Sequence, residues 1–175
     1  EDEKAIDARL EVIAPVAERE VALEIGQAAP TVDALDCGGD GVVIDGLAPI
    51  LFGTIDGGEN GVIASASSRI VASVKNVRGA GVVVAVAPSE GDEGEEEEGV
   101  VEVLGDVEDN DTGILCLAGR LTAPTTIRGN AVGVDVRGAC LAALSDIVLE
   151  DNDIACRVQD LAAEAVGEPP EITLG

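Results

Sequence analysis

Apolar and polar positions alternate in short phrases that return at a nearly fixed interval along the chain. In six copies a glycine, or once an aspartate, precedes an apolar-x-apolar pair: Gly41, Gly61, Gly81, Gly113, Gly133 and Asp153. The starts lie 20, 20, 32, 20 and 20 residues apart. A fixed period of this length is typical of a solenoid, in which each turn buries its apolar face against its neighbours.

Within each copy every second side chain is apolar, which predicts a strand with one buried face. The second position holds Val42, Val62, Val82, Ile114, Val134 and Ile154, and the fourth holds Ile44, Ala64, Val84, Cys116, Val136 and Cys156. We expect these side chains to stack in columns, with neighbours about 4.8 Å apart, along a parallel sheet. The positions between them, including Asp135, Arg137 and Arg157, are expected to face solvent.

A second apolar stretch follows in each turn. These stretches cover residues 50–55, 70–77, 100–107, 121–127, 140–149 and 161–166, and the first five end in a polar segment. Asn110, Asn130 and Asn152 recur at nearly the same place in three of those segments. Since Asn tolerates left-handed backbone and bonds neighbouring amides, this recurrence predicts bends joined by a ladder of side-chain amides.

The stacked aliphatic positions and the Asn at the bends resemble the right-handed parallel β-helix of pectate-lyase-like proteins. The resemblance covers residues 38–175 and implies an all-β, single-stranded coil with turns of about 20 residues. Residues 1–37 are expected to form an N-terminal cap, with a short helix over 5–13 and an irregular first turn around Val21, Leu23 and Ile25. Residues 88–99 lengthen the third turn, and their run of Glu predicts a solvated loop.

The net charge is −25, with 35 acidic residues against 10 basic ones, of which only Lys4 and Lys75 are lysines. This balance argues against nucleic acid or anionic membrane as a partner. It resembles proteins of extreme halophiles, whereas the plainer interpretation is an acidic secreted protein. The sequence holds no apolar run of 18 residues, so it predicts no membrane span. The start at Glu1 predicts a removed leader or a fragment, and we expect an extracellular or cell-surface location.

Four cysteines raise the question of disulfides. Cys116 and Cys156 fall in one column but two turns apart, which is about 10 Å and beyond disulfide reach. Cys37 and Cys140 have no obvious partner in the pattern. We therefore expect Cys116, Cys140 and Cys156 to be small buried hydrophobic residues. The lack of His and of CxxC spacing argues against zinc, haem and iron–sulfur sites.

Two sets of residues are candidates for chemistry. Acidic residues at the bends suggest calcium, a cation that takes oxygen ligands; the candidates are Asp106, Asp109, Asp111, Asp151 and Asp153. Asp135, Arg137 and Arg157 are the candidates for a catalytic group, because their positions share one outer face. Ordinary surface ion pairing explains this second set more simply.

The function expected from these features is a non-catalytic structural or adhesive solenoid, either a subunit of a filament or a partner of other surface proteins. Open ends of such a coil can dock end to end. The alternatives are a polysaccharide lyase or glycoside hydrolase on a β-helix scaffold, and a calcium-dependent binding module. Without Tyr, Trp or His, the chain offers neither the usual sugar-stacking rings nor a histidine acid–base group.

Overall fold

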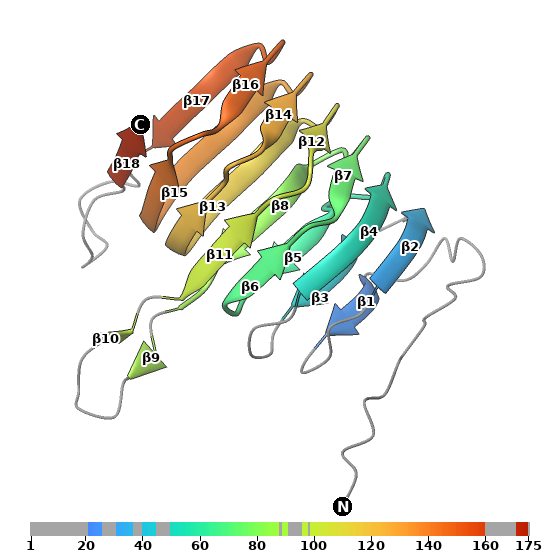
Figure 1. Cartoon of the computed structure of the whole chain (residues 1–175), viewed down its shortest axis with the longest axis horizontal. Helices are drawn as coiled ribbons and strands as arrows, with labels where there is room; N and C mark the ends of the chain where they lie inside the picture. The colour runs from blue at the N-terminus through green and yellow to red at the C-terminus, as the bar shows by residue number, and fades with distance from the viewer. Residues whose placement is uncertain are drawn as a thin grey trace, which may run out of the picture.

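The computed structural model describes residues 21–25, 31–36, 40–44, 50–87, 89–90, 96–97, 99–159 and 171–174. These residues form a parallel β-solenoid of about five turns and contain no helix (Figure 1). The all-β, coiled fold class predicted from the repeat is confirmed. The helix expected over 5–13 lies outside the described residues, as does the apolar stretch 161–166. No helix in the described part of the chain is long and apolar enough to cross a membrane.

Each turn has three flat sides, which we call faces 1, 2 and 3 in chain order. Face 1 consists of β1 (Val21–Ile25), β3 (Asp40–Ile44), β5 (Val62–Ala64), β8 (Ala80–Ala85), the first halves of β13 (Thr112–Thr122) and β15 (Val132–Leu144), and β17 (Ile154–Gln159). Face 2 consists of the start of β4 (Ile50–Asp56), β6 (Ser68–Ile70), β11 (Val100–Val103), the second halves of β13 and β15, and β18 (Glu171–Leu174). Face 3 consists of β2 (Thr31–Asp36), the end of β4, β7 (Ser73–Lys75), β12 (Val107–Glu108), β14 (Thr126–Arg128) and β16 (Val148–Glu150).

In each turn where it is described, the second apolar stretch therefore supplies two faces, where the sequence had indicated one continuous segment. Residues 70–77, for example, contain the end of β6 and the whole of β7, with a bend at Val71 and Ala72 between them. Hydrophobic alternation shows which side chains are buried. It does not show where a short strand changes direction, because a bend of one or two residues can keep apolar side chains on its inner side.

The predicted columns fill the interior. Val62, Val82, Ile114 and Val134 are fully buried and stand in register from strand to strand. A parallel column forms from Ala64, Val84, Cys116 and Val136. Burial of each such aliphatic side chain is worth about 1.5–3 kcal/mol, so the stacked columns are the main source of stability.

The last turn departs from the predicted register by two residues. Val134 pairs with Cys156 and Val136 with Val158, so the interval is 22 residues and not 20. One extra residue enters beside Gly138, since Cys116 pairs with Val136 but Leu121 with Ala142. The other enters at residues 144–147, where Asp146 adopts a left-handed φ of 64°. Ile154 and Cys156 consequently stand one column away from the places that the sequence pattern indicated.

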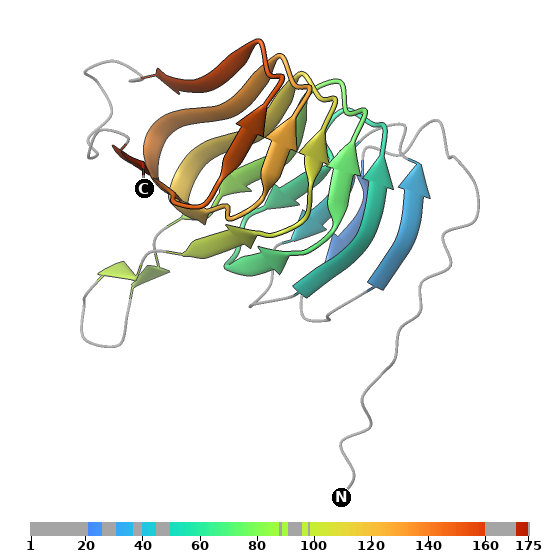
Figure 2. The same cartoon turned by 45° about the horizontal axis from the view of Figure 1, so that its top comes forward.

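The bend between faces 1 and 2, here called the glycine corner, lies inside two long strands. In Figure 2, β13 and β15 are the long curved ribbons in the yellow-to-orange part of the coil. They bend at Gly119, with a φ of 87°, and at Gly138, with a φ of 62°. An L-residue rarely adopts such backbone, which explains why glycine stands at both places. The pairing of β13 shifts register here, between Cys116 and Ala118.

A disulfide joins Cys116 of one turn to Cys140 of the next across the glycine corner. The prediction that both residues are unpaired hydrophobic side chains was wrong. The separation of about 10 Å that excludes a Cys116–Cys156 bridge applies along the axis of the coil, whereas Cys140 approaches Cys116 across a bend. The bend brings the second half of β15 back towards the first half of β13, so the two Cα atoms lie 5.9 Å apart. Cys156 carries a free, half-buried thiol.

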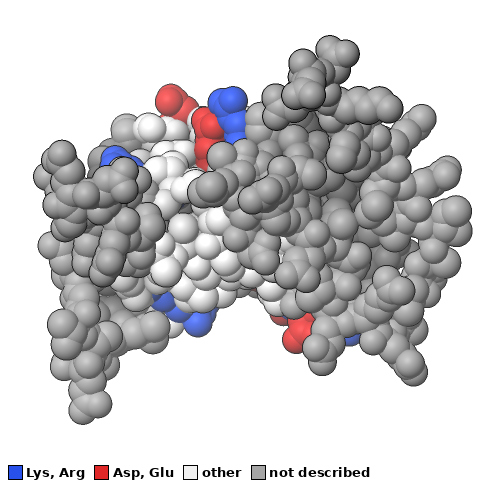
Figure 3. All heavy atoms as spheres, turned by 90° about the horizontal axis from the view of Figure 1, so that it is seen from below, with Lys and Arg blue, Asp and Glu red and all other residues white. Residues whose placement is uncertain are grey.

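The Glu-rich insertion leaves the coil at the glycine corner that follows β8. Its described residues form two short antiparallel strands, β9 (Ser89–Glu90) and β10 (Glu96–Glu97), which project away from the coil in Figure 1. Seen from below, the described middle of the molecule presents mostly uncharged residues, with charged side chains at its margins (Figure 3).

Candidate functional site

The bend between faces 3 and 1, here called the ladder corner, repeats one backbone conformation in four turns. Its first position holds Asn76, Asp109, Gly129 and Asp151, with φ values of 55°, 54°, 66° and 51°. Asn, Asp and Gly are the residues that best tolerate left-handed backbone. The acidic residues predicted at the bends are therefore placed there partly by the geometry of the turn.

The second position of the ladder corner carries the predicted amide ladder, which is confirmed. The Oδ1 atom of Asn130 accepts hydrogen bonds from the backbone N–H of Asn110 at 2.9 Å and from its Nδ2 at 3.0 Å. Asn152 receives the same two bonds from Asn130, at 3.0 and 2.9 Å. Asn110 in turn accepts from the backbone N–H of Val77. The ladder thus satisfies buried backbone groups that would otherwise be without partners.

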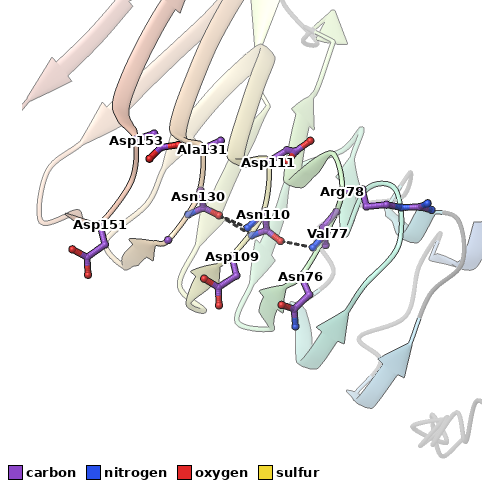
Figure 4. A pocket seen from close by; sticks show the side chains of 11 residues that line it. Asn76, Val77, Arg78, Asp109, Asn110, Asp111, Asn130, Ala131, Asp151 and Asp153 are labelled. Carbon is purple, nitrogen blue, oxygen red and sulfur yellow. Dashed lines mark hydrogen bonds between the residues drawn. The ribbon is translucent and has the colours of Figure 1, made fainter.

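An open hollow of about 530 Å³ lies over the ladder corner. Asp109 and Asp111 border it on one side and Asp151 and Asp153 on the other, while the turn between them is lined by two small residues, Gly129 and Ala131, beside Asn130 (Figure 4). In the same view the carboxylates of Asp109 and Asp151 point away from the strands, whereas the Asn110 and Asn130 side chains point along the ladder. The structure therefore brings four of the five predicted acidic residues to one hollow.

The fifth, Asp106, lies apart from the hollow. It precedes β12, whereas Asp109 follows that strand, so the two residues stand at opposite ends of face 3. Asp106 was grouped with Asp109 and Asp111 because they are close in the sequence. An intervening strand, even one of two residues, separates them.

The spacing of the four carboxylates bears on the calcium prediction. The pairs stand two turns apart, which is about 10 Å. Calcium takes its oxygen ligands at about 2.3–2.6 Å, so one ion cannot contact both pairs in this arrangement. Among the residues that the structure describes, no three Asp, Glu or Cys side chains converge closely enough to hold a metal ion. Calcium binding stays a prediction.

Asp135, Arg137 and Arg157 do come together on the outer side of face 1, but the 22-residue interval pairs Arg157 with Asp135 and not with Arg137, which a 20-residue interval would have given. The Oδ2 atom of Asp135 accepts a bond from Nε of Arg137 at 2.9 Å and also bonds the Nη2 atoms of both arginines. Asp135 is nevertheless 0% exposed, so the expectation that it faces solvent was wrong. It holds two half-buried guanidinium groups, one from its own strand and one from the next turn.

Burial favours the neutral form of Asp135, but the hydrogen bonds and charges of Arg157 and Arg137 outweigh it and hold its pKa below the usual range. The carboxylate is thus ionised at neutral pH and is a poor proton donor. Its Oδ1 atom and Nε of Arg157 are buried and have no hydrogen-bond partner among the described residues. The arrangement joins adjacent turns and leaves the carboxylate no exposed surface on which to meet a substrate.

A charged column that the repeat pattern did not indicate runs along the outer side of face 3. Register places five residues of alternating sign in it: Asp56, Lys75, Glu108, Arg128 and Glu150. Ion pairs join Lys75 to Asp56 at 3.4 Å and Arg128 to Glu108 at 2.8 Å. The hydrogen bond and charge of Glu108 raise the pKa of Arg128. Each of them directly precedes the left-handed residue of its bend, so an alignment on the polar bends would have shown this alternation, whereas the 20-residue period does not.

Comparison with known proteins adds no assignment. No protein family, curated protein or solved structure matches the chain.

Proposed function

We propose that this chain is a non-catalytic structural solenoid that works outside the cell or at its surface, as a stiff spacer, an adhesive element or a subunit of an assembly. The observation that carries this proposal is the way adjacent turns are fastened to one another. Aliphatic columns, the amide ladder and an interior disulfide all link turn to turn in the same stretch of the coil. Several independent links between adjacent turns are what a stiff structural protein requires.

One feature supports the proposed location, and another supports the proposed source. Disulfides persist in oxidising surroundings and are rare in the cytosol, and the Cys116–Cys140 bridge is fully buried. The net charge of −25 suits a protein kept hydrated in concentrated salt, which supports an extreme halophile as the source. A kinship with pectate-lyase-like β-helices belongs to the same proposal and is supported by the parallel coil.

A search for enzyme activity tests the non-catalytic role. The full chain and an Asp135→Asn variant would be incubated with neutral and acidic polysaccharides in high salt, and new reducing ends and unsaturated products would be measured. We expect neither protein to release any. Release by the native chain that Asp135→Asn abolishes would overturn the proposal in favour of a lyase or hydrolase.

Calcium-dependent binding can be tested on the same protein. A melting temperature at high ionic strength that is equal with calcium and with a chelator would dismiss it. A rise with calcium that Asp109→Asn and Asp151→Asn remove would instead support a binding module at the ladder corner.

A further inference from the structure

The outer side of face 1 is apolar through the middle of the coil. Register places one outward column along it, which passes through β3, β5, β8 and β13 in the order Val43, Ile63, Val83 and Leu115. These side chains alternate with those of the buried interior columns, so they point away from the core. Val83 is 8% exposed and the other three are half-buried. The four residues form an aliphatic strip on the side of the coil, here called the outer strip.

The strands under the outer strip are apolar on both of their sides. β8 has the sequence AGVVVA, and β13 contains the run ILCL. Face 3 is different, because its strands alternate between buried aliphatic residues and the charged column. Continuous apolar runs are typical of parallel strands that are covered on both sides of their sheet. The composition of face 1 therefore favours a second layer over the outer strip.

The residues at the two ends of the outer strip carry opposite charges. Glu24 of β1 stands one strand before the strip. Asp135 and then Arg157 stand after it. Asp135 is fully buried and bonded to its two arginines, whereas the Arg157 side chain is 33% exposed. The outer strip thus lies between a negative residue at one end and an exposed positive side chain at the other.

From these observations we infer that the outer strip packs against the outer strip of a second copy of the chain, with the two coils running in opposite directions. A two-fold axis that lies between the sheets and parallel to the strands gives this contact. Register then places Val83 opposite Val83 of the second copy, and Ile63 opposite its Leu115. It also places Glu24 opposite Arg157, once at each end. Apolar contact and charge complementarity therefore favour the same alignment.

Charge argues against the other orientation, in which both coils run in the same direction. Each residue of the column would then lie opposite its own copy, so that Glu24 would meet Glu24 and Arg157 would meet Arg157. Like charges placed directly opposite each other are destabilising. The inference rests on the proposed structural role and adds to it the partner, the surface and the orientation.

Salt should strengthen the contact between the two copies. Each copy carries a net charge of −25, so two copies repel at long range. Screening shortens the reach of that repulsion from about 10 Å at 0.1 M salt to about 3 Å at 1 M. The apolar contact between the outer strips is not screened, so association should become tighter as salt rises.

Sedimentation equilibrium of the full chain over a range of protein and salt concentrations tests the association. We expect a dimer, and we expect Leu115→Glu to weaken it at least about tenfold, because it places a charge in an apolar contact. Val100→Glu is the matched control, since Val100 is 40% exposed but lies in β11, on face 2. A monomer at every salt concentration, or equal effects of the two variants, would overturn the inference.

Thiol cross-linking tests the orientation, in a background of Cys37→Ser and Cys156→Ser that removes the cysteines outside the bridge. Proteins carrying Ile63→Cys or Leu115→Cys would be treated, separately and mixed, with a bismaleimide about 10 Å long, which matches the distance between packed sheets. The mixture should give several times more covalent dimer than either protein alone, because the two positions face each other only when the coils run in opposite directions. Equal or lower yields from the mixture would contradict the inference.

The cross-linking variants keep the outer strip uncharged, so this measurement does not depend on the fold tolerating a new charge. Failure of either test would leave the non-catalytic role intact, since the polysaccharide assay tests that role separately.

Discussion

The ladder corner and the glycine corner turn the same chain through the same coil by different means. At the ladder corner, Asn110, Asn130 and Asn152 bond buried backbone groups of the preceding turn, and the bond repeats at each step. At the glycine corner, Gly119 and Gly138 supply left-handed backbone, and one disulfide fastens two turns. The first solution is made of many small, local contributions, and the second concentrates its effect in one covalent bond.

This difference predicts that single substitutions at the ladder corner have graded effects, whereas the glycine corner depends chiefly on its disulfide. Measurements of the free energy of unfolding in high salt would separate the two. The following substitutions run from the largest expected effect to the smallest.

Removal of the disulfide by Cys116→Ala with Cys140→Ala should lower the free energy of unfolding by about 3.5 kcal/mol, because the bridge closes a loop with a sequence separation of 24 residues. Denaturant unfolding measures this. Cys156→Ala is the matched control, since its thiol is free and only half buried, and it should change stability by less than about 1 kcal/mol. Equal effects would mean that the bridge contributes little.

Within the ladder, Asn130→Ala should cost about 3 kcal/mol, because Asn130 is 1% exposed and its loss leaves the buried N–H of Asn110 without its acceptor. Asn152→Ala removes the acceptor of the Asn130 N–H in the same way, but its own side chain is only half buried and water can replace it, so it should cost less, about 2 kcal/mol. Chemical denaturation of both variants measures the two losses in the free energy of unfolding. Equal losses would contradict the idea that the burial of each Asn determines how much it contributes to stability.

Asp135→Asn should cost about 2 kcal/mol at neutral pH, since it leaves two adjacent guanidinium groups without a carboxylate. The lowered pKa of Asp135 determines how its contribution to the free energy of unfolding changes with pH. Its contribution is present above the ordinary value of 3.8 and is lost as pH falls through the lower folded value. The stability difference between native chain and variant should therefore shrink below about pH 4. A difference that is constant with pH would show that Asp135 is not ionised in the fold.

The smallest effects concern the bend glycines. Gly129→Ala should cost about 1 kcal/mol for its left-handed backbone, and Gly129→Asn should cost less because the equivalent places hold Asn76, Asp109 and Asp151. Gly138→Ala should cost more than Gly129→Ala. Its Cβ would lie 2.9 Å from the backbone oxygen of Leu117, whereas the atom nearest a Cβ at 129 is the movable carboxylate of Asp109. Thermal melts rank the three variants.

Much of this fold was predictable because it repeats. Val62, Val82 and Val134 are buried in columns, and the three Asn residues form their ladder, because equal spacing along a coil brings equivalent residues one above another. For the candidate sites, the sequence correctly grouped Asp135 with Arg137 and Arg157, and it placed four of the five acidic residues together but wrongly added Asp106.

The sequence by itself determined the stacked coil, its inward residues and its polar bends, since these follow from periodicity and from the backbone preferences of Asn, Asp and Gly. Only the tertiary structure decided the third face, the 22-residue last turn, the Cys116–Cys140 bridge and the burial of Asp135. Each of these depends on how many residues a corner absorbs. A bulge or an added turn residue leaves the alternation of apolar side chains intact while it changes which residues of neighbouring turns meet.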